Sequence, residues 1–340
     1  MQKRTYAAAA TIALMLLTAC GEEAPESGPS DGNPATETKS FTVAFTSHGI
    51  SHAPTLAALE QLRQDGYEIE APVLAESELV TAGTAQGQFA FGVAATGSML
   101  TAVSKGANLK AVVLRNANEW TVWGQQDISE CADLDGKRLA IHSPGGDSTK
   151  MVERYVETTC PGTEPSYVVV SGSSNRLAAL LANEIDASPL ELSDAITLQS
   201  RGEGRYRQLA SFAESLPDLY TDAIYVNGDF AEANPEAVTA FVRAVVEQHR
   251  EIAGNPEYLV EIANTYVPDV IDQSTVEEVA RSYVELEIFP ENAELTEEGL
   301  KYTMDFFGPD GTGATDKIMP VEEFADLTFL NEVLDELGRR

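Results

Sequence analysis

Strand-like and helix-like segments alternate along the first two hundred residues of this 340-residue chain. Residues 41–46 alternate apolar and polar side chains, as in a half-buried strand. Pro54 then stands where a first helical turn accepts proline, ahead of Leu56, Leu59 and Leu62. Further strand-like segments lie at 67–74, 88–94 and 109–114, and helix-like segments lie between them at 77–84 and 98–105. This repeated unit predicts a mainly parallel sheet with helices on both faces.

A second series of strand and helix units begins after residues 121–124 and then gives way to helices. Its strand-like segments lie at 137–143, 167–171, 185–188 and 223–226. From Pro235 the pattern is helical, at 235–252, 257–266, 275–286, 297–306 and 321–337. Because roughly 300 residues are long for one hydrophobic core, two lobes are expected.

The N-terminus has the pattern of an export signal. Lys3 and Arg4 precede an apolar run at 7–17 that is too short to span a bilayer comfortably. The run ends in Leu16-Leu17-Thr18-Ala19-Cys20-Gly21, which resembles the lipobox of bacterial lipoproteins. That resemblance implies a signal peptide at 1–19, cleavage before Cys20 and acylation of its thiol, which anchors the protein outside the cytoplasm at the cell membrane. An ordinary export signal whose cleavage site contains a cysteine is the alternative.

Residues 20–40 contain no large apolar side chain and are predicted to be a disordered tether. The chain carries 54 acidic and 22 basic residues, and loss of 1–19 removes Lys3 and Arg4 but no acid. The mature net charge is therefore 20 − 54 = −34. A field of that sign repels nucleic acid and anionic lipid head groups, so neither is predicted as a partner.

The two remaining cysteines, Cys131 and Cys160, are predicted to form a disulfide, which export permits. A strand at 137–143 and a helix at 147–159 each rise roughly 20 Å, so a hairpin of the two returns the cysteines to the same end. Closing this loop would stabilise the fold by roughly 3 to 4 kcal/mol. Two separate buried thiols are the alternative.

Four segments of the chain resemble the substrate-binding proteins of ABC importers in the sulfonate, nitrate, taurine and thiamine-precursor group. They are Gln-Gly-Gln-Phe-Ala-Phe-Gly at 86–92, Ala-Val-Ser-Lys-Gly-Ala-Asn-Leu-Lys at 102–110, Asp-Leu-Asp-Gly-Lys-Arg-Leu-Ala at 133–140, and Ala-Leu-Leu-Ala-Asn-Glu-Ile-Asp-Ala at 179–187. The chain departs from the family at Asn183-Glu184, where glycine is usual, and at Ser188-Pro189-Leu190-Glu191, where many relatives have Glu-Pro.

The resemblance implies an α/β, two-lobed type II periplasmic-binding-protein fold with two hinge crossings and a solute in the cleft. We expect the crossings near 121–125 and 220–225. Lobe one would then comprise 41–125 plus 222–340, and lobe two 126–221. Ligands of open α/β sheets lie beyond the carboxyl ends of the strands, which yields a short set of candidate residues.

Lobe one offers Ser47 and His48 after the first strand and Thr96 after the third. His48 is either a hydrogen-bonding ligand contact or a capping or surface histidine, and His52 is expected at the surface. Thr96 either faces the cleft or caps its helix. Asn116 and Trp120 follow the fourth strand, and the indole provides a flat apolar wall, unless it is a core tryptophan.

Lobe two offers Gly145, Gly146, Asp147 and Ser148, where glycines let the backbone approach a ligand and a helix start presents free N–H donors. Asp147 itself either caps those donors or contacts the ligand. Ser188, Glu191 and Tyr225 complete the set of ligand-binding candidates.

No arginine or lysine other than Lys150 was found in these turns, whereas acids and an indole occur. The resemblance implies a lipid-anchored receptor that delivers a solute to an ABC permease and its ATPase, and this balance of residues favours a neutral or cationic nitrogen heterocycle, such as a thiamine-type pyrimidine. An aliphatic sulfonate or taurine receptor and a sensory solute-binding lipoprotein are the alternatives. We expect a monomer.

Catalysis is not predicted, and neither a cofactor nor a metal site is expected. Ser47, Ser148 and Ser173 are conceivable nucleophiles, but the chain has no Gly-x-Ser-x-Gly elbow, no Ser-x-x-Lys around these serines and no His-Glu-x-x-His. Some relatives of this fold are pyrimidine-synthesis enzymes, but the lipobox directs this chain to a compartment where that pathway does not run.

Overall fold

The computed structural model describes residues 39–269, 272–309 and 311–340, and every structural statement below concerns these residues. The expected signal peptide, Cys20 and nearly all of the expected tether lie outside them. Within the described part of the chain, no helix is long and apolar enough to cross a membrane.

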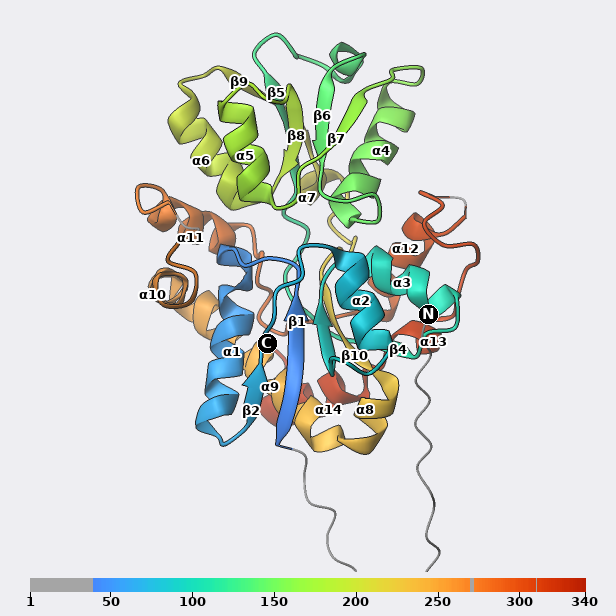
Figure 1. Cartoon of the computed structure of the whole chain (residues 1–340). Coiled ribbons are helices and arrows are strands. Elements are labelled where there is room, and N and C mark those ends of the chain that lie inside the picture. Colours follow the sequence, from blue (N-terminus) through green and yellow to red (C-terminus); the bar gives the residue numbers. More distant parts are fainter. Residues whose placement is uncertain (1–38, 270–271, 310) are drawn as a thin grey trace, which may run out of the picture. The chain divides into compact units, whose positions relative to one another are not determined.

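Two five-stranded sheets organise the chain (Figure 1). The first has the order β2-β1-β3-β10-β4, with β1 Ser40–Phe45, β2 Glu68–Glu70, β3 Phe91–Val93, β4 Leu109–Leu114 and β10 Ala223–Asn227. The second has the order β7-β6-β8-β5-β9, with β5 Thr121–Gln125, β6 Arg138–Ile141, β7 Ser166–Val169, β8 Ala187–Leu190 and β9 Tyr206–Ser211. The predicted two-lobed α/β fold is confirmed.

Each sheet consists of parallel strands with one reversed strand. In the first sheet, β10 runs antiparallel to both β3 and β4. In the second, β5 runs antiparallel to both β8 and β9. These are the two strands that the chain enters on coming from the other sheet. Their amino ends therefore lie at the same edge as the carboxyl ends of their neighbours, where open α/β sheets bind ligands.

Helices cover the sheets. Those that accompany the first sheet are α1 Ala53–Gln64, α2 Ser77–Ala85, α3 Thr96–Ser104, α8 Gly228–Ala233, α9 Pro235–Gly254, α10 Pro256–Tyr266, α11 Val276–Glu285, α12 Glu297–Phe307, α13 Val321–Phe324 and α14 Thr328–Leu337. Those between or directly after the strands of the second sheet are α4 Asp147–Thr159, α5 Ser173–Leu181, α6 Leu192–Gly202 and α7 Phe212–Ser215. Two short 3-10 helices are η1 Ile50–His52 and η2 Cys131–Leu134.

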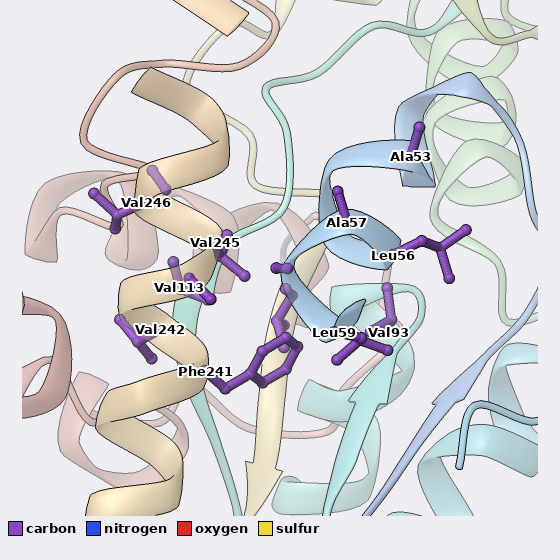
Figure 2. Packing of buried hydrophobic residues seen from close by; sticks show 14 of the residues in the cluster. Ala53, Leu56, Ala57, Leu59, Val93, Val113, Phe241, Val242, Val245 and Val246 are labelled. Atoms are coloured by element: carbon purple, nitrogen blue, oxygen red, sulfur yellow. The ribbon is translucent and has the colours of Figure 1, made fainter. Parts of the chain in front are cut away.

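The main core lies where α1 and α9 pack on one face of the first sheet. Figure 2 shows Leu59 of α1 and Phe241 of α9 beside Val93 of β3. The rings of Phe91 and Phe241 meet edge to face, with centroids 4.8 Å apart. Burial of each such side chain stabilises the fold by about 1.5 to 3 kcal/mol, so this layer fixes the positions of the strand ends.

The second sheet has a core on each face. Trp123 packs with Leu177 and Leu180 of α5, and its Nε1 donates to Thr121 Oγ1 at 2.9 Å. On the other face, Cys131 and Cys160 are disulfide-bonded, with their Cα atoms 5.7 Å apart. The predicted disulfide is confirmed, and it ties η2 to the C-terminal end of α4.

The structure differs from the sequence-based expectation in several places. The predicted helix at 321–337 is two helices, α13 Val321–Phe324 and α14 Thr328–Leu337, because the backbone is extended at Ala325. The segment 121–125, expected as a crossing, is β5 of the second sheet, so the connection between the sheets precedes it. The expected crossing at 220–225 likewise ends where β10 begins, at Ala223. Strand β9 was not anticipated. The exact limits of the two lobes remain a prediction.

Candidate functional site

A small polar cavity lies where turns from both sheets converge. It is lined by Thr46, Ser47, His52, Ser77, Ala95, Arg115, Trp120, His142, Gly146, Asp147, Ser148, Gly172, Ser173, Glu191, Thr221 and Asp222. Several of these residues directly follow parallel strands, and three others directly precede the reversed strands β5 and β10. The cavity therefore occupies the edge that the strand directions single out.

The cavity measures about 50 Å³. That volume suits one or two water molecules, each with a share of about 30 Å³, and is far below the roughly 300 Å³ at which pockets for drug-sized ligands begin. Entry of an organic solute therefore requires the two lobes to move apart.

A larger hollow of about 890 Å³ lies elsewhere, between α4, α7 and α12. Its walls include Tyr155, Tyr302 and Phe306. It touches the carboxyl end of one strand, β9, and shares no residue with the polar cavity where turns from both sheets converge, so the fold gives it a weaker claim to be the ligand site.

Half of the predicted ligand residues meet at the cavity: Ser47, Trp120, Gly146, Asp147, Ser148 and Glu191. His48 is adjacent, with its ring 5.2 Å from that of Phe45, and burial lowers its pKa. Gly145 lies at the rim, where its N–H donates to Glu78 Oε1 at 2.9 Å.

The other predicted residues have internal partners. Thr96 Oγ1 accepts from the Ala223 N–H at 3.0 Å, and Asn116 donates to Glu119 Oε1 at 3.2 Å. Ser188 is fully buried and donates to the Pro189 carbonyl. Tyr225 is fully buried within β10, where its hydroxyl bonds with Thr81 Oγ1 at 2.9 Å. These four side chains therefore bond within the protein and hold the strands and their connections in place, and none of them lines the cavity.

Arg115 is a lining residue that the sequence analysis overlooked. It directly follows β4 and is 3% exposed, so the statement that these turns hold no arginine was wrong. Its Nη2 lies 2.7 Å from Asp222 Oδ1, and its Nη1 donates to Ser51 Oγ at 3.0 Å. A polar residue directly after a buried strand was the signal that could have found Arg115, since the same signal selected Asn116.

His52 was expected at the surface, and this expectation was wrong because η1 folds inward. The side chain is 4% exposed and lines the cavity. Its Nδ1 accepts from the Gly49 N–H at 3.2 Å. Burial, Arg115 and His48 together hold the pKa of His52 well below its usual value, so the ring is neutral and accepts a hydrogen bond.

Buried carboxyl groups dominate the electrostatics of the site. Burial raises the pKa of Asp147 and of Glu191 well above their usual values. Burial also raises the pKa of Glu119, directly before Trp120, to about 7. Among the residues described as lining the cavity, Arg115 is the one permanent cation, and it is already paired with Asp222. The site favours a ligand that brings donors or positive charge.

Glu119 joins the connection between the sheets to two helices. Its Oε2 accepts from Tyr283 Oη of α11 at 2.5 Å and from the N–H of Leu192, the first residue of α6, at 3.3 Å. This carboxyl group therefore holds the segment from which Trp120 projects.

Trp120 lines the cavity and also packs on a buried arginine. The guanidinium carbon of Arg176 lies 5.6 Å from the centre of the indole. Arg176 in turn donates to the Pro189 carbonyl at 3.0 Å and to the Val170 carbonyl at 3.2 Å. The cation–π contact and these bonds fix the indole as a rigid wall.

Asp147 belongs to α4 but caps the N-terminus of a different helix, α3. It is the first residue of α4, and its carboxylate accepts from the Gly97 N–H at the start of α3 at 2.9 and 3.2 Å. Since α3 accompanies the first sheet and α4 the second, this bond joins the two lobes across the cavity.

No group of three or more His, Cys, Asp or Glu side chains within residues 39–269, 272–309 and 311–340 is arranged to hold a metal ion.

The fold and the position of the cavity define a periplasmic-binding-protein type of molecule. A family profile described as NMT1/THI5 like matches residues 50–258, more than half of the chain. The chain belongs to the NMT1/THI5-like family. A search of curated proteins finds no match.

Solved structures share the fold at low sequence identity. The alkanesulfonate-binding protein SsuA from Xanthomonas axonopodis pv. citri, bound to MOPS, aligns with a TM-score of 0.66 and 16% identity over 85% of this chain and 98% of its own. The nitrate-binding protein NrtA from Synechocystis PCC 6803 aligns with a TM-score of 0.67 and 16% identity over 89% and 90%. A cysteine-to-serine mutant of DszB, an enzyme, in complex with biphenyl-2-sulfinic acid, aligns with a TM-score of 0.62 and 16% identity over 88% and 99%.

Proposed function

We propose that this chain is a lipid-anchored solute-binding receptor that closes two lobes around a small organic solute and delivers it to the permease and ATPase of an ABC importer. Membership of the NMT1/THI5-like family supports this role. So does a fold shared with sulfonate-binding and nitrate-binding proteins. The cavity, with walls from both sheets, supports binding by lobe closure.

The residues that line the cavity support the proposed class of solute. A rigid indole, Trp120, stands with the carboxyl groups of half-buried Glu191 and buried Asp147, while the single lining cation is paired with Asp222. Ring stacking and N–H donors directed at carboxylates satisfy such a wall. We therefore propose a neutral or cationic nitrogen heterocycle, with a thiamine-type pyrimidine as the first compound to test.

The test uses the purified full chain, Trp120→Ala and Glu191→Gln in a thermal-shift screen of aminopyrimidines, flavins, aromatic acids, sulfonates, taurine and nitrate. Solute at a hundred times its Kd stabilises a protein by about 2.7 kcal/mol, a measurable shift in Tm. We expect a heterocycle to bind, and each substitution to weaken that binding more than tenfold in calorimetry. Tyr302→Ala, in the larger hollow, is the matched control and should bind normally. Normal binding by both cavity variants would refute the proposed site.

An aliphatic sulfonate or taurine is the second candidate solute, because a MOPS-bound alkanesulfonate receptor is among the fold neighbours. In that case the screen would yield sulfonates, and the backbone donors of Gly145 and Gly146 would contact the ligand. If neither class of compound binds, a sensory lipoprotein becomes the favoured function, since its ligand need not be one of the solutes that ABC importers carry.

We propose that Cys20 carries the anchor, that the protein lies outside the cytoplasm and that it acts as a monomer. We also propose that lobe two begins with β5 and not at residue 126, because β5 pairs within the second sheet. The first connection between the lobes is then the segment 115–120, and lobe two ends at about 221. Catalysis is not part of the proposal, although one fold neighbour is an enzyme.

A further inference from the structure

Two backbone N–H groups at the junction of the lobes each meet a carboxylate from the opposite lobe. The Gly97 N–H of α3, in the first lobe, donates to Asp147 of the second at 2.9 and 3.2 Å. The Gly145 N–H, which precedes α4 in the second lobe, donates to Glu78 Oε1 of α2 in the first at 2.9 Å. The exchange is reciprocal, since each lobe supplies one carboxylate and one donor.

Glycine is what makes room for each carboxylate. A Cβ atom at position 97 would lie 2.5 Å from Asp147 Oδ1. At position 145 it would lie 2.2 Å from Glu78 Oε1. Any other residue would push the opposing carboxylate away. A further bond from Ser98 Oγ to the Gly145 carbonyl, at 2.9 Å, holds the same two segments together.

The Gly97 N–H belongs to the first turn of α3, and the Gly145 N–H lies two residues before the first residue of α4, in the turn that leads into it. The first turn of a helix presents unpaired N–H groups and a partial positive charge, and anions from solution commonly bind there. Here α3 has nine residues and α4 thirteen, so both are full helices. Asp147 is 4% exposed, which makes its position at the start of α3 inaccessible to a free anion while the lobes are together.

We propose that the carboxyl groups of Asp147 and Glu78 are internal acceptors that set the selectivity of the cleft: their oxygens occupy the two backbone N–H donors that would otherwise hold a sulfonate, nitrate or similar oxyanion. The inference rests on the proposed receptor function, because it concerns which solutes the cleft admits. It also assigns a role to Glu78, which stands outside the set of residues that line the cavity.

The experiment measures binding of methanesulfonate, nitrate and sulfate to the full chain by titration calorimetry, with ionic strength fixed by chloride. We expect the wild-type protein to bind none of them more tightly than chloride. Asp147→Ser, which removes the carboxylate and leaves the Gly97 N–H free, should bind methanesulfonate at least tenfold more tightly. Adding Glu78→Gln to this variant should strengthen binding further.

Asp194→Asn is the matched control. Asp194 is also a buried acid of the second lobe with a raised pKa caused by burial, but its carboxylate faces Ser174 rather than the N–H of Gly97 or Gly145. This control should gain no anion binding. An equal gain in Asp194→Asn would overturn the proposal, because the overall field, and not occupancy of the donors, would then exclude anions.

Gly145→Ala tests the exchange where Asp147→Ser fails to fold. The three atoms nearest to the added Cβ all belong to the side chain of Glu78, which is exposed and can turn away. We expect this variant to fold and to expose the N–H donor of residue 145 alone, with an at least tenfold gain in methanesulfonate affinity.

The outcomes separate this inference from the receptor proposal. Binding of a heterocycle by the wild type together with no gain of anion binding in any variant would overturn the inference alone. Tight binding of methanesulfonate by the wild type would overturn it as well, while leaving the receptor role intact. A gain in Asp147→Ser in a protein that binds no organic solute would support the internal acceptors and count against the proposed solute.

Discussion

Removal of the disulfide between Cys131 and Cys160 should cost the protein a large share of its stability. The two cysteines are 29 residues apart in sequence. For a loop of that length, the chain-entropy relation predicts about 3.6 kcal/mol at 25 °C. Folded domains are stable by only about 5 to 15 kcal/mol, so a variant with both cysteines changed to alanine should unfold at a clearly lower urea concentration.

The assay is equilibrium urea unfolding followed by circular dichroism at pH 7. Wild-type protein reduced with excess thiol is the control, because it lacks the cross-link but keeps both sulfur atoms. It should lose nearly as much free energy of unfolding as the double-alanine variant. A loss below about 1 kcal/mol in both samples would refute the entropy argument. A loss in the alanine variant alone would assign the effect to packing of the sulfur atoms, both of which are buried.

Three further outcomes are expected. Burial raises the pKa of Glu119 from 4.5 to about 7, so its contribution to stability is complete below about pH 4.5 and is lost as the pH rises through 7. The unfolding free energy of the wild type should therefore fall relative to that of Glu119→Gln between these pH values; parallel curves would contradict this. Phe241→Ala, in the core under α9, should cost about 3 to 5 kcal/mol in urea unfolding, whereas Tyr302→Ala at the surface should cost less than 1. Cys20→Ser should release the protein from the membrane fraction of expressing cells, and retention would exclude the lipid anchor.

Most of the fold could be predicted from local patterns. The apolar alternation of β1, the Pro54 start of α1 and the buried run of β4 all lie where the sequence indicated. The antiparallel direction of β5 and β10 could not be predicted, because it depends on the sheet that each strand joins after the chain passes from one lobe to the other. Strand β9 escaped notice because its first half carries exposed Arg207 and Gln208.

The candidate site was only partly predictable, for a related reason. Ser188 was taken as a strand end, but β8 continues to Leu190 and turns this side chain into the core. Tyr225 lies in the middle of β10 and not at its end. The role of Asp147 depends on a partner fifty residues away on another helix, and no local signal reveals such a contact.

The placement of β10 has a consequence for the order in which the molecule can form. All strands of the second sheet lie in one stretch, between 121 and 211, whereas β3 and β4 of the first sheet gain their shared neighbour only when residues 223–227 arrive. A chain emerging N-terminus first thus carries two bare strand edges until two thirds of it has appeared. Such edges are prone to pair with other chains. Successful production of this protein should therefore depend on a holding chaperone, or on rapid completion of synthesis and translocation, more than on its final stability.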